Sequence, residues 1–284
     1  MRRSPSLLLS FVLVLFGLFA GAVSAAPRQP IPAAELVKLT GFDRALDDVA
    51  RSLAQEGIRA ASEGHAIGEA QEFALAWAAA AQEAFAPERL KEALGKRIAG
   101  KLTDKELFAI EDFFKGRLGK SMVAREVASG TQQGQQDMAS RAQRLMTDLM
   151  RKPKRIEALE GVANAIRLKE ASVEMALNMM RAVLIGLSAA DKSQLSMPID
   201  LINEQIEAHR ESVTQETEAV IMLAMAYTYR TATVSDLNAY AKFLRSPPGK
   251  RFFDVAMGGL DAVLSESGLV FGNLLMQSLG RMPI

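Results

Sequence analysis

Two stretches of this chain of 284 residues resemble each other, and this similarity constrains the fold more than any other feature. Residues 102–122 read LTDKELFAIEDFFKGRLGKSM and residues 232–252 read ATVSDLNAYAKFLRSPPGKRF, with six of 21 positions identical. The starts of the two halves, residues 35–53 and 166–184, also match at nearly the same spacing. Self-similarity at a fixed spacing is typical of folds built from copies of one supersecondary unit. We therefore predict two similar units related by internal duplication.

Each copy of the repeated stretch begins with the sequence signature of a capped helix. Thr103 is followed three residues later by Glu106, and Thr233 is followed three residues later by Asp236. A threonine N-cap with an acid at the third helical position is typical of a capping box. Apolar residues then recur at helical spacing, which predicts that one face of each helix points into the core. These residues are Leu107, Ile110, Phe113 and Phe114 in the first copy, and Leu237, Tyr240, Ala241 and Leu244 in the second.

Each predicted helix is followed by a corner in the chain. In the second copy the corner reads SPPGK, residues 246–250, where the prolines stop the helix. In the first copy it reads GRLGK, residues 116–120, and the missing prolines predict a softer break. We interpret the corner as structural: the aromatic residue, Phe113 or Phe243, is buried as an anchor, and the glycine lets the chain turn.

The composition favours helices throughout the chain. Aromatic residues make up only 6% of the sequence, whereas alanine and methionine, which favour helices, are plentiful. Apolar residues at 49% and charged residues at 24% are typical of a folded globular protein. A charged, proline-marked break lies at residues 152–154. The prediction is an all-α protein with a first helical unit over residues 26–150 and a second over residues 151–284.

The first 25 residues have the pattern of a signal peptide for export. Arg2 and Arg3 precede an apolar run over residues 7–20, and small residues follow up to Ala25. This pattern predicts cleavage after Ala25 and a periplasmic mature protein. The alternative is an uncleaved membrane anchor. We expect no later segment to span a bilayer, because the apolar runs at residues 182–190 and 219–229 are too short.

At several motifs the chain resembles a family of exported bacterial proteins, the domain of unknown function numbered 2059. The resemblance rests on LVKLTG at residues 36–41, TVSDL at residues 233–237 and FLRSPPGK at residues 243–250. It suggests two tandem copies, of which the second matches better, because residues 116–118 depart from the family pattern. It implies an all-helical exported protein and no particular activity. The motif positions, all expected to be structural, are Thr103, Leu107, Phe113, Gly119, Lys120, Thr233, Leu237, Phe243, Ser246, Pro247, Gly249 and Lys250.

Residues for catalysis or metal binding are scarce. The chain has no cysteine and two histidines, His65 and His209, which have no metal-ligand spacing and are expected to be solvated. We predict no catalytic, cofactor or metal site. The methionine group at Met175, Met179 and Met180 is interpreted as core filling rather than as a soft-metal site. Equally, Lys120 and Lys250 are expected to be solvated rather than to bind an anion.

These observations favour a non-enzymatic periplasmic module that binds an envelope protein or an apolar ligand. Lysine plus arginine number 34 and aspartate plus glutamate 33, so we expect no nucleic-acid partner. One alternative is peripheral membrane association through the apolar segment 268–280, which either closes the bundle or is exposed. Another is an enzyme without a recognisable motif, which would need converging carboxylates such as Glu111 and Asp112, expected on the surface. The sequence leaves the ligand and the oligomeric state open.

Overall fold

The computed structural model describes residues 28–62, 69–190 and 197–280, and all regular structure within these ranges is α-helical. Residues 31–284 group into one compact unit. The helices are α1 (Ala33–Leu39), α2 (Phe42–Ser62), α3 (Ala70–Ala84), α4 (Pro87–Ile98), α5 (Asp104–Lys115), α6 (Arg117–Gly130), α7 (Gln132–Met150), α8 (Pro153–Ala165), α9 (Leu168–Ala190), α10 (Ile199–Ala208), α11 (Arg210–Thr228), α12 (Val234–Arg245) and α13 (Pro247–Leu279). The predicted all-α class is confirmed for this part of the chain. The predicted export signal and His65 lie outside the described residues.

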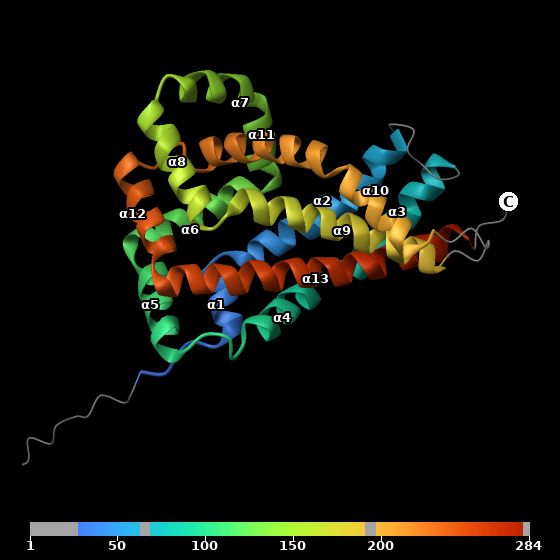
Figure 1. Cartoon of the computed structure of the whole chain (residues 1–284), viewed down its shortest axis with the longest axis horizontal. Coiled ribbons are helices and arrows are strands. Elements are labelled where there is room, and N and C mark those ends of the chain that lie inside the picture. Colours follow the sequence, from blue (N-terminus) through green and yellow to red (C-terminus); the bar gives the residue numbers. More distant parts are fainter. Residues whose placement is uncertain (1–27, 63–68, 191–196, 281–284) are drawn as a thin grey trace, which may run out of the picture. The chain divides into compact units, whose positions relative to one another are not determined.

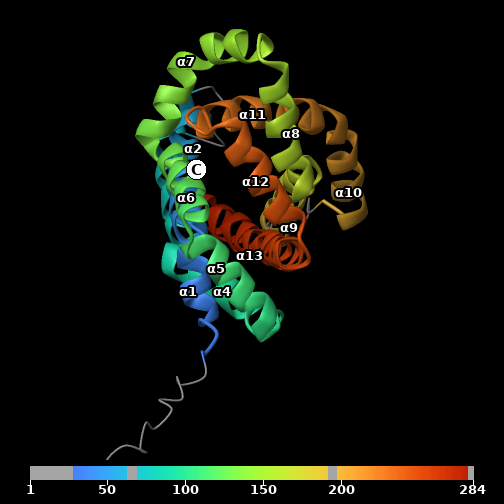
Figure 2. The same cartoon turned by 90° about the vertical axis from the view of Figure 1, so that its left-hand side faces the viewer.

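Helices from the two halves of the sequence lie on opposite sides of α13 (Figures 1 and 2). In Figure 2 the elements α1, α2, α4, α5 and α6 lie to one side of α13 and α8, α9, α10 and α12 to the other, while α11 passes above α13 and contacts α6 and α7. The long α13 contacts α3, α4 and α5 as well as α9 and α12, so it joins both sides. The predicted boundary at residue 150 coincides with the end of α7, but it falls inside the compact unit.

Both predicted capping boxes are present. The backbone N–H of Glu106 donates to Thr103 Oγ1 over 3.3 Å, and the Thr103 N–H donates to the Glu106 carboxylate over 2.8 Å. In the second copy the Asp236 N–H donates to Thr233 Oγ1 over 3.0 Å, and the reciprocal bond measures 3.3 Å. Hydrogen bonding from threonine lowers the pKa of both Glu106 and Asp236. The two helices α5 and α12 therefore begin in the same way.

The two corners also share one backbone conformation, so the expected softer break in the first copy is wrong. Gly116 has φ −70° and ψ 164°, and Ser246 has φ −66° and ψ 154°. Ser246 adds a side-chain cap, because its hydroxyl accepts a hydrogen bond from the Gly249 N–H over 3.3 Å. The backbone therefore makes the same turn with proline in the second copy and without it in the first.

The corner glycines have a different role from the one expected. A Cβ at Gly119 would lie 2.3 Å from the carbonyl oxygen of Phe113, and one at Gly249 would lie 2.2 Å from that of Phe243. Both residues occupy the third position of a helix, α6 or α13, and neither needs a left-handed backbone. Glycine is thus required for the close approach of each new helix to the end of the preceding one.

The motif phenylalanines Phe113 and Phe243 meet each other. Their rings stack face to face with centroids 3.6 Å apart and an interplanar angle of 1°. Both are half-buried rather than buried as expected, whereas the neighbouring Phe114 is buried. The two copies of the repeated stretch therefore touch through their equivalent aromatic residue.

The apolar segment 268–280 closes the core on one face. It forms the end of α13, which lies beside α9 (Figure 1), and Phe271 and Leu275 are buried there. Glycines permit this close packing: a Cβ at Gly272 would lie 2.2 Å from the Val183 carbonyl oxygen, and one at Gly186 would lie 2.2 Å from that of Leu269. The segment thus packs one face on the core, whereas Leu269 and Val270 on its other face are exposed.

Two described helices, α9 and α13, are long and apolar enough to cross a membrane by length and composition. The expectation that no later segment could do so is wrong on this criterion. The run at residues 182–190 lies in the longer helix α9, and α13 includes most of the apolar segment 268–280, whereas the run at residues 219–229 belongs to α11 and its end. Core helices of soluble proteins meet the same criterion, and α13 carries core residues such as Phe252, Ala256 and Phe271. We therefore interpret α9 and α13 as helices that pack against each other rather than as membrane spans.

Candidate functional site

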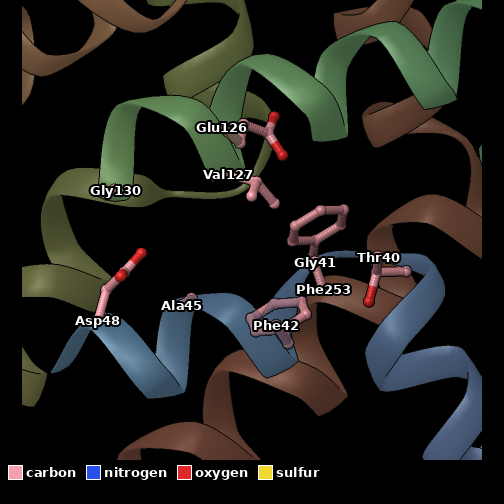
Figure 3. Close-up of a pocket in the computed structure, with 9 residues that line it drawn as sticks. All are labelled: Thr40, Gly41, Phe42, Ala45, Asp48, Glu126, Val127, Gly130 and Phe253. Atoms are coloured by element: carbon pink, nitrogen blue, oxygen red, sulfur yellow. The ribbon is translucent and has the colours of Figure 1, made fainter. Parts of the chain in front are cut away.

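Two neighbouring pockets lie between elements of the two halves and share the residues Glu126 and Phe253. The first pocket has a volume of about 280 Å³ and is formed by the start of α2, the end of α6 and Phe253 of α13 (Figure 3). The second pocket has a volume of about 360 Å³. Its apolar lining includes Val162, Ile166, Leu168, Val220, Ile221 and Met225. Glu126 thus marks the place where the two pockets meet.

The first pocket depends on the turn at the end of LVKLTG, residues 36–41, one of the motifs on which the family resemblance rests. Thr40 ends α1, and its hydroxyl donates to the carbonyl oxygen of Leu36 over 2.8 Å. Gly41 has φ +80°, a left-handed conformation that favours glycine. A Cβ there would also lie 3.1 Å from Val123 on α6. The glycine therefore turns the chain into α2 and lets α2 approach α6.

Glu126 reaches the pockets because it follows the buried face of α6. It lies one helical turn after Met122, which is fully buried, so both side chains point in a similar direction. Figure 3 shows its carboxyl group above the ring of Phe253 and across the pocket from Asp48. A Cβ at Gly130 would lie 2.5 Å from the Asp48 carboxylate, so the end of α6 closes this side of the pocket.

Two tyrosine hydroxyls converge on one oxygen of Glu126. Tyr229, at the end of α11, donates to Oε1 over 2.6 Å, and Tyr240 of α12 donates to the same atom over 3.1 Å. Burial raises the pKa of the Glu126 carboxyl, although the two tyrosine bonds act in the opposite direction. Burial also raises the pKa of both tyrosines, so they remain hydroxyl donors at neutral pH.

Further polar contacts hold α11 and its end against α6 and α7 around this site. The Thr228 and Ser129 hydroxyls are 2.9 Å apart, and Tyr227 donates to the Asp137 carboxylate over 2.9 Å. Arg125 donates to the Thr231 hydroxyl over 3.1 Å. These bonds hold α11 in place beside α6, and both of these helices contribute residues to the second pocket.

The motif positions predicted in and beside α5 and α12 lie outside the two pockets, but one of them supports the site. The ring of Phe113 stacks parallel to that of Tyr240, with centroids 5.9 Å apart. This contact positions the tyrosine that donates to Glu126. Lys120 and Lys250 are exposed as expected, and Lys250 pairs with Asp254 over 2.6 Å.

Several other expectations can be compared with the structure. Glu111 was expected on the surface, but only 5% of it is exposed, and it pairs with Lys115. Glu111 lies on the same face of α5 as Leu107 and Phe114, which the sequence had predicted to point into the core, and this explains the error. His209 is exposed as expected, at the junction of α10 and α11. Within the described ranges no group of three or more histidine, aspartate or glutamate residues could hold a metal ion.

The methionines behave largely as core residues. Met175 and Met179 are half-buried and pack against the main core, whereas Met180 is 37% exposed. Met225 is buried and lines the second pocket. The interpretation as core filling thus holds for Met175 and Met179, and Met225 has a place at the site.

Sequence analysis missed Glu126 and Tyr229 as site residues and treated Tyr240 as an ordinary core residue. The available signal was a carboxylate on the apolar face of a helix, one turn after the buried Met122. No short motif surrounds Glu126, and its tyrosine partners lie 103 and 114 residues away in the sequence. No family model, curated protein or solved structure matches the chain, so the resemblance to the domain numbered 2059 stays a prediction.

Proposed function

We propose that this chain is a non-enzymatic binding protein of the bacterial periplasm that holds an apolar ligand in the two pockets around Glu126. One observation carries this proposal: two apolar pockets of about 280 and 360 Å³ adjoin at a shared carboxyl group. Small-molecule sites usually span roughly 300–1,000 Å³ and combine apolar walls with a few polar groups. The pair of pockets fits that description.

The proposed location rests on the sequence pattern of residues 1–25. A basic start, an apolar run and small residues before Ala26 are typical of a cleaved export signal. We expect the mature protein to begin at Ala26. Intact-mass measurement of the exported protein tests this, and retention of residues 1–25 would contradict it.

The proposal includes a tandem duplication, which is supported by two contacts that the repeated helices share. Helix α5 contacts α6 and α13, and α12 contacts α13 and α6, whereas their further neighbours α1 and α8 do not correspond at the spacing of the repeat. The equivalent positions Met122 and Phe252 are both fully buried. In this arrangement the two copies are not alike at the site: Glu126 corresponds to Ala256, so one copy alone supplies the carboxyl group.

The binding role can be tested with the uncharged fluorophore Nile red and a variant that fills the second pocket. Ala224 of α11 lines this pocket, and Ala219 lies exposed on the same helix. We expect Nile red fluorescence to rise on binding to the wild type and to the Ala219→Phe control. The Ala224→Phe variant should bind at least about tenfold more weakly, because its ring occupies the ligand's space. Equal binding by both variants, or none by the wild type, would refute the proposed site.

A further inference from the structure

The two hydrogen bonds to the Glu126 carboxyl group both go to one of its two oxygen atoms. Both tyrosine hydroxyls donate to Oε1, and no hydrogen bond or ion pair to Oε2 occurs within the described part of the chain. A carboxylate can accept about four hydrogen bonds. The second oxygen therefore remains available at the junction of the two pockets.

The described linings of the two pockets include acidic residues and no basic residue. Glu126 and Asp48 line the first pocket and Glu126 lines the second, and neither described lining includes lysine, arginine or histidine. Arg125, next to Glu126 in the chain, donates to Ser121 and Thr231 instead. Asp48 pairs outside the pocket with Arg51 over 2.5 Å. The charge of the lining thus favours a cationic group on the ligand over an anionic one.

Aromatic rings add to this preference. Phe42 and Phe253 line the first pocket, and Phe253, Tyr229 and Tyr240 line the second. The face of an aromatic ring attracts a cation through its quadrupole. A carboxylate beside several aromatic rings is a combination that suits an organic ammonium group, whose carbon chain needs apolar walls.

We propose that the ligand is an amphiphilic amine whose ammonium group binds Glu126 Oε2 and whose apolar part occupies the second pocket. This inference rests on the proposed function and specifies its ligand class. The raised pKa of Glu126 is consistent with it, because burial without a cation disfavours the carboxylate and a bound ammonium group removes that penalty. A neutral ligand that accepts a hydrogen bond from protonated Glu126 is the competing arrangement, and the experiment distinguishes the two.

The experiment displaces Nile red from the wild-type protein with octylamine, octanol and octanoate at neutral pH. The three share one alkyl chain and differ in the head group, so the comparison isolates the charge. We expect octylamine to displace the dye at a concentration at least about tenfold lower than octanol, because its ammonium group adds an ionic attraction to the Glu126 carboxylate that a hydroxyl group lacks. Octanoate should be the weakest of the three.

The Glu126→Gln variant then tests whether the carboxylate of Glu126 causes the preference for octylamine. The ratio of the octanol to the octylamine concentration that displaces the dye should fall to about one in this variant, because the preference for octylamine is lost. Asp254→Asn is the matched control, because it removes one negative charge from an exposed position of α13 outside both pockets. This control should keep the preference.

The outcomes separate the two proposals. If the wild type binds no Nile red, the proposed function fails. If it binds the dye but octylamine is no better than octanol, or octanoate is best, the amine inference is overturned and the binding function stands. Retention of the octylamine preference in Glu126→Gln would also overturn the role of Glu126. The head-group series on the wild type needs no variant, so it decides the question even if Glu126→Gln does not fold.

Discussion

Removing the stacked rings of Phe113 and Phe243 tests how the two copies of the repeated stretch hold together. The rings lie 3.6 Å apart and parallel, and each also meets Phe114 edge to face at 5.2 or 5.6 Å. Replacement of a fully buried phenylalanine by alanine costs about 3–5 kcal/mol. Because both rings are half-buried, we expect each single substitution to lower the free energy of unfolding by about 2–3 kcal/mol.

The two substitutions should not be additive. An aromatic pair contributes about 0.5–1.5 kcal/mol beyond the area it buries, and the first substitution already removes that contribution. The double variant should therefore lose about 1 kcal/mol less than the sum of the two single losses. Urea denaturation followed by circular dichroism gives all four free energies of unfolding.

A control pair of substitutions tests whether the non-additive effect arises from the stacked rings of Phe113 and Phe243. Phe73 of α3 is buried and contacts Trp77 at 5.7 Å rather than either ring of the pair. Phe73→Ala combined with Phe113→Ala should be additive to within about 0.5 kcal/mol. Additivity of Phe113→Ala and Phe243→Ala would refute the claim that the two copies stabilise each other through these rings.

The remaining predictions concern the corner at residues 246–250, the neighbouring helix α13 and the carboxyl group of Glu126. Gly249→Ala should cost about 1–3 kcal/mol in thermal or urea unfolding, because its Cβ would meet a carbonyl oxygen at 2.2 Å. Gly258→Ala, where a Cβ meets nothing within 4 Å in the same helix, should stabilise by about 0.4–1 kcal/mol; equal effects would contradict the close-approach argument. Lys250→Ala should cost less than about 0.5 kcal/mol, since its partner Asp254 is a surface residue, and a larger loss would assign the lysine a structural role. For Glu126 the folded-state pKa is raised, so its favourable contribution is present at low pH and is lost as pH rises through that pKa. The stability of Glu126→Gln relative to wild type should therefore increase between about pH 5 and about pH 8 in urea titrations, and a constant difference would show that Glu126 stays ionised in the fold.

The parts of the fold that could be predicted from sequence are those decided by neighbouring residues. The capping boxes at Thr103 and Thr233 each involve residues three apart, so a local pattern reveals them. The length of α13 could not be predicted in this way. It continues through Gly268 and Gly272, which would weaken an isolated helix, because contact with α9 compensates for their low helix propensity.

The candidate site could not be predicted because its contacts are distant in sequence. Glu126 meets Tyr229 and Tyr240 only after α11 and α12 fold back onto α6. The face-to-face contact of Phe113 with Phe243 could not be predicted for the same reason, because the two residues are distant in sequence. Phe113 and Phe243 align in the two similar stretches of sequence, but an alignment of two positions does not predict that they touch.

Methyl NMR of the full mature protein, titrated with octylamine, detects whether the proposed amphiphilic amine occupies the second pocket. We predict saturable shifts at Val162, Ile166 and Ile221, whose side chains line or adjoin this pocket, and unchanged signals at Val173 and Ile202 in a separate core cluster. Shifts spread evenly over both groups, or no shift at Val162, Ile166 and Ile221, would contradict the claim.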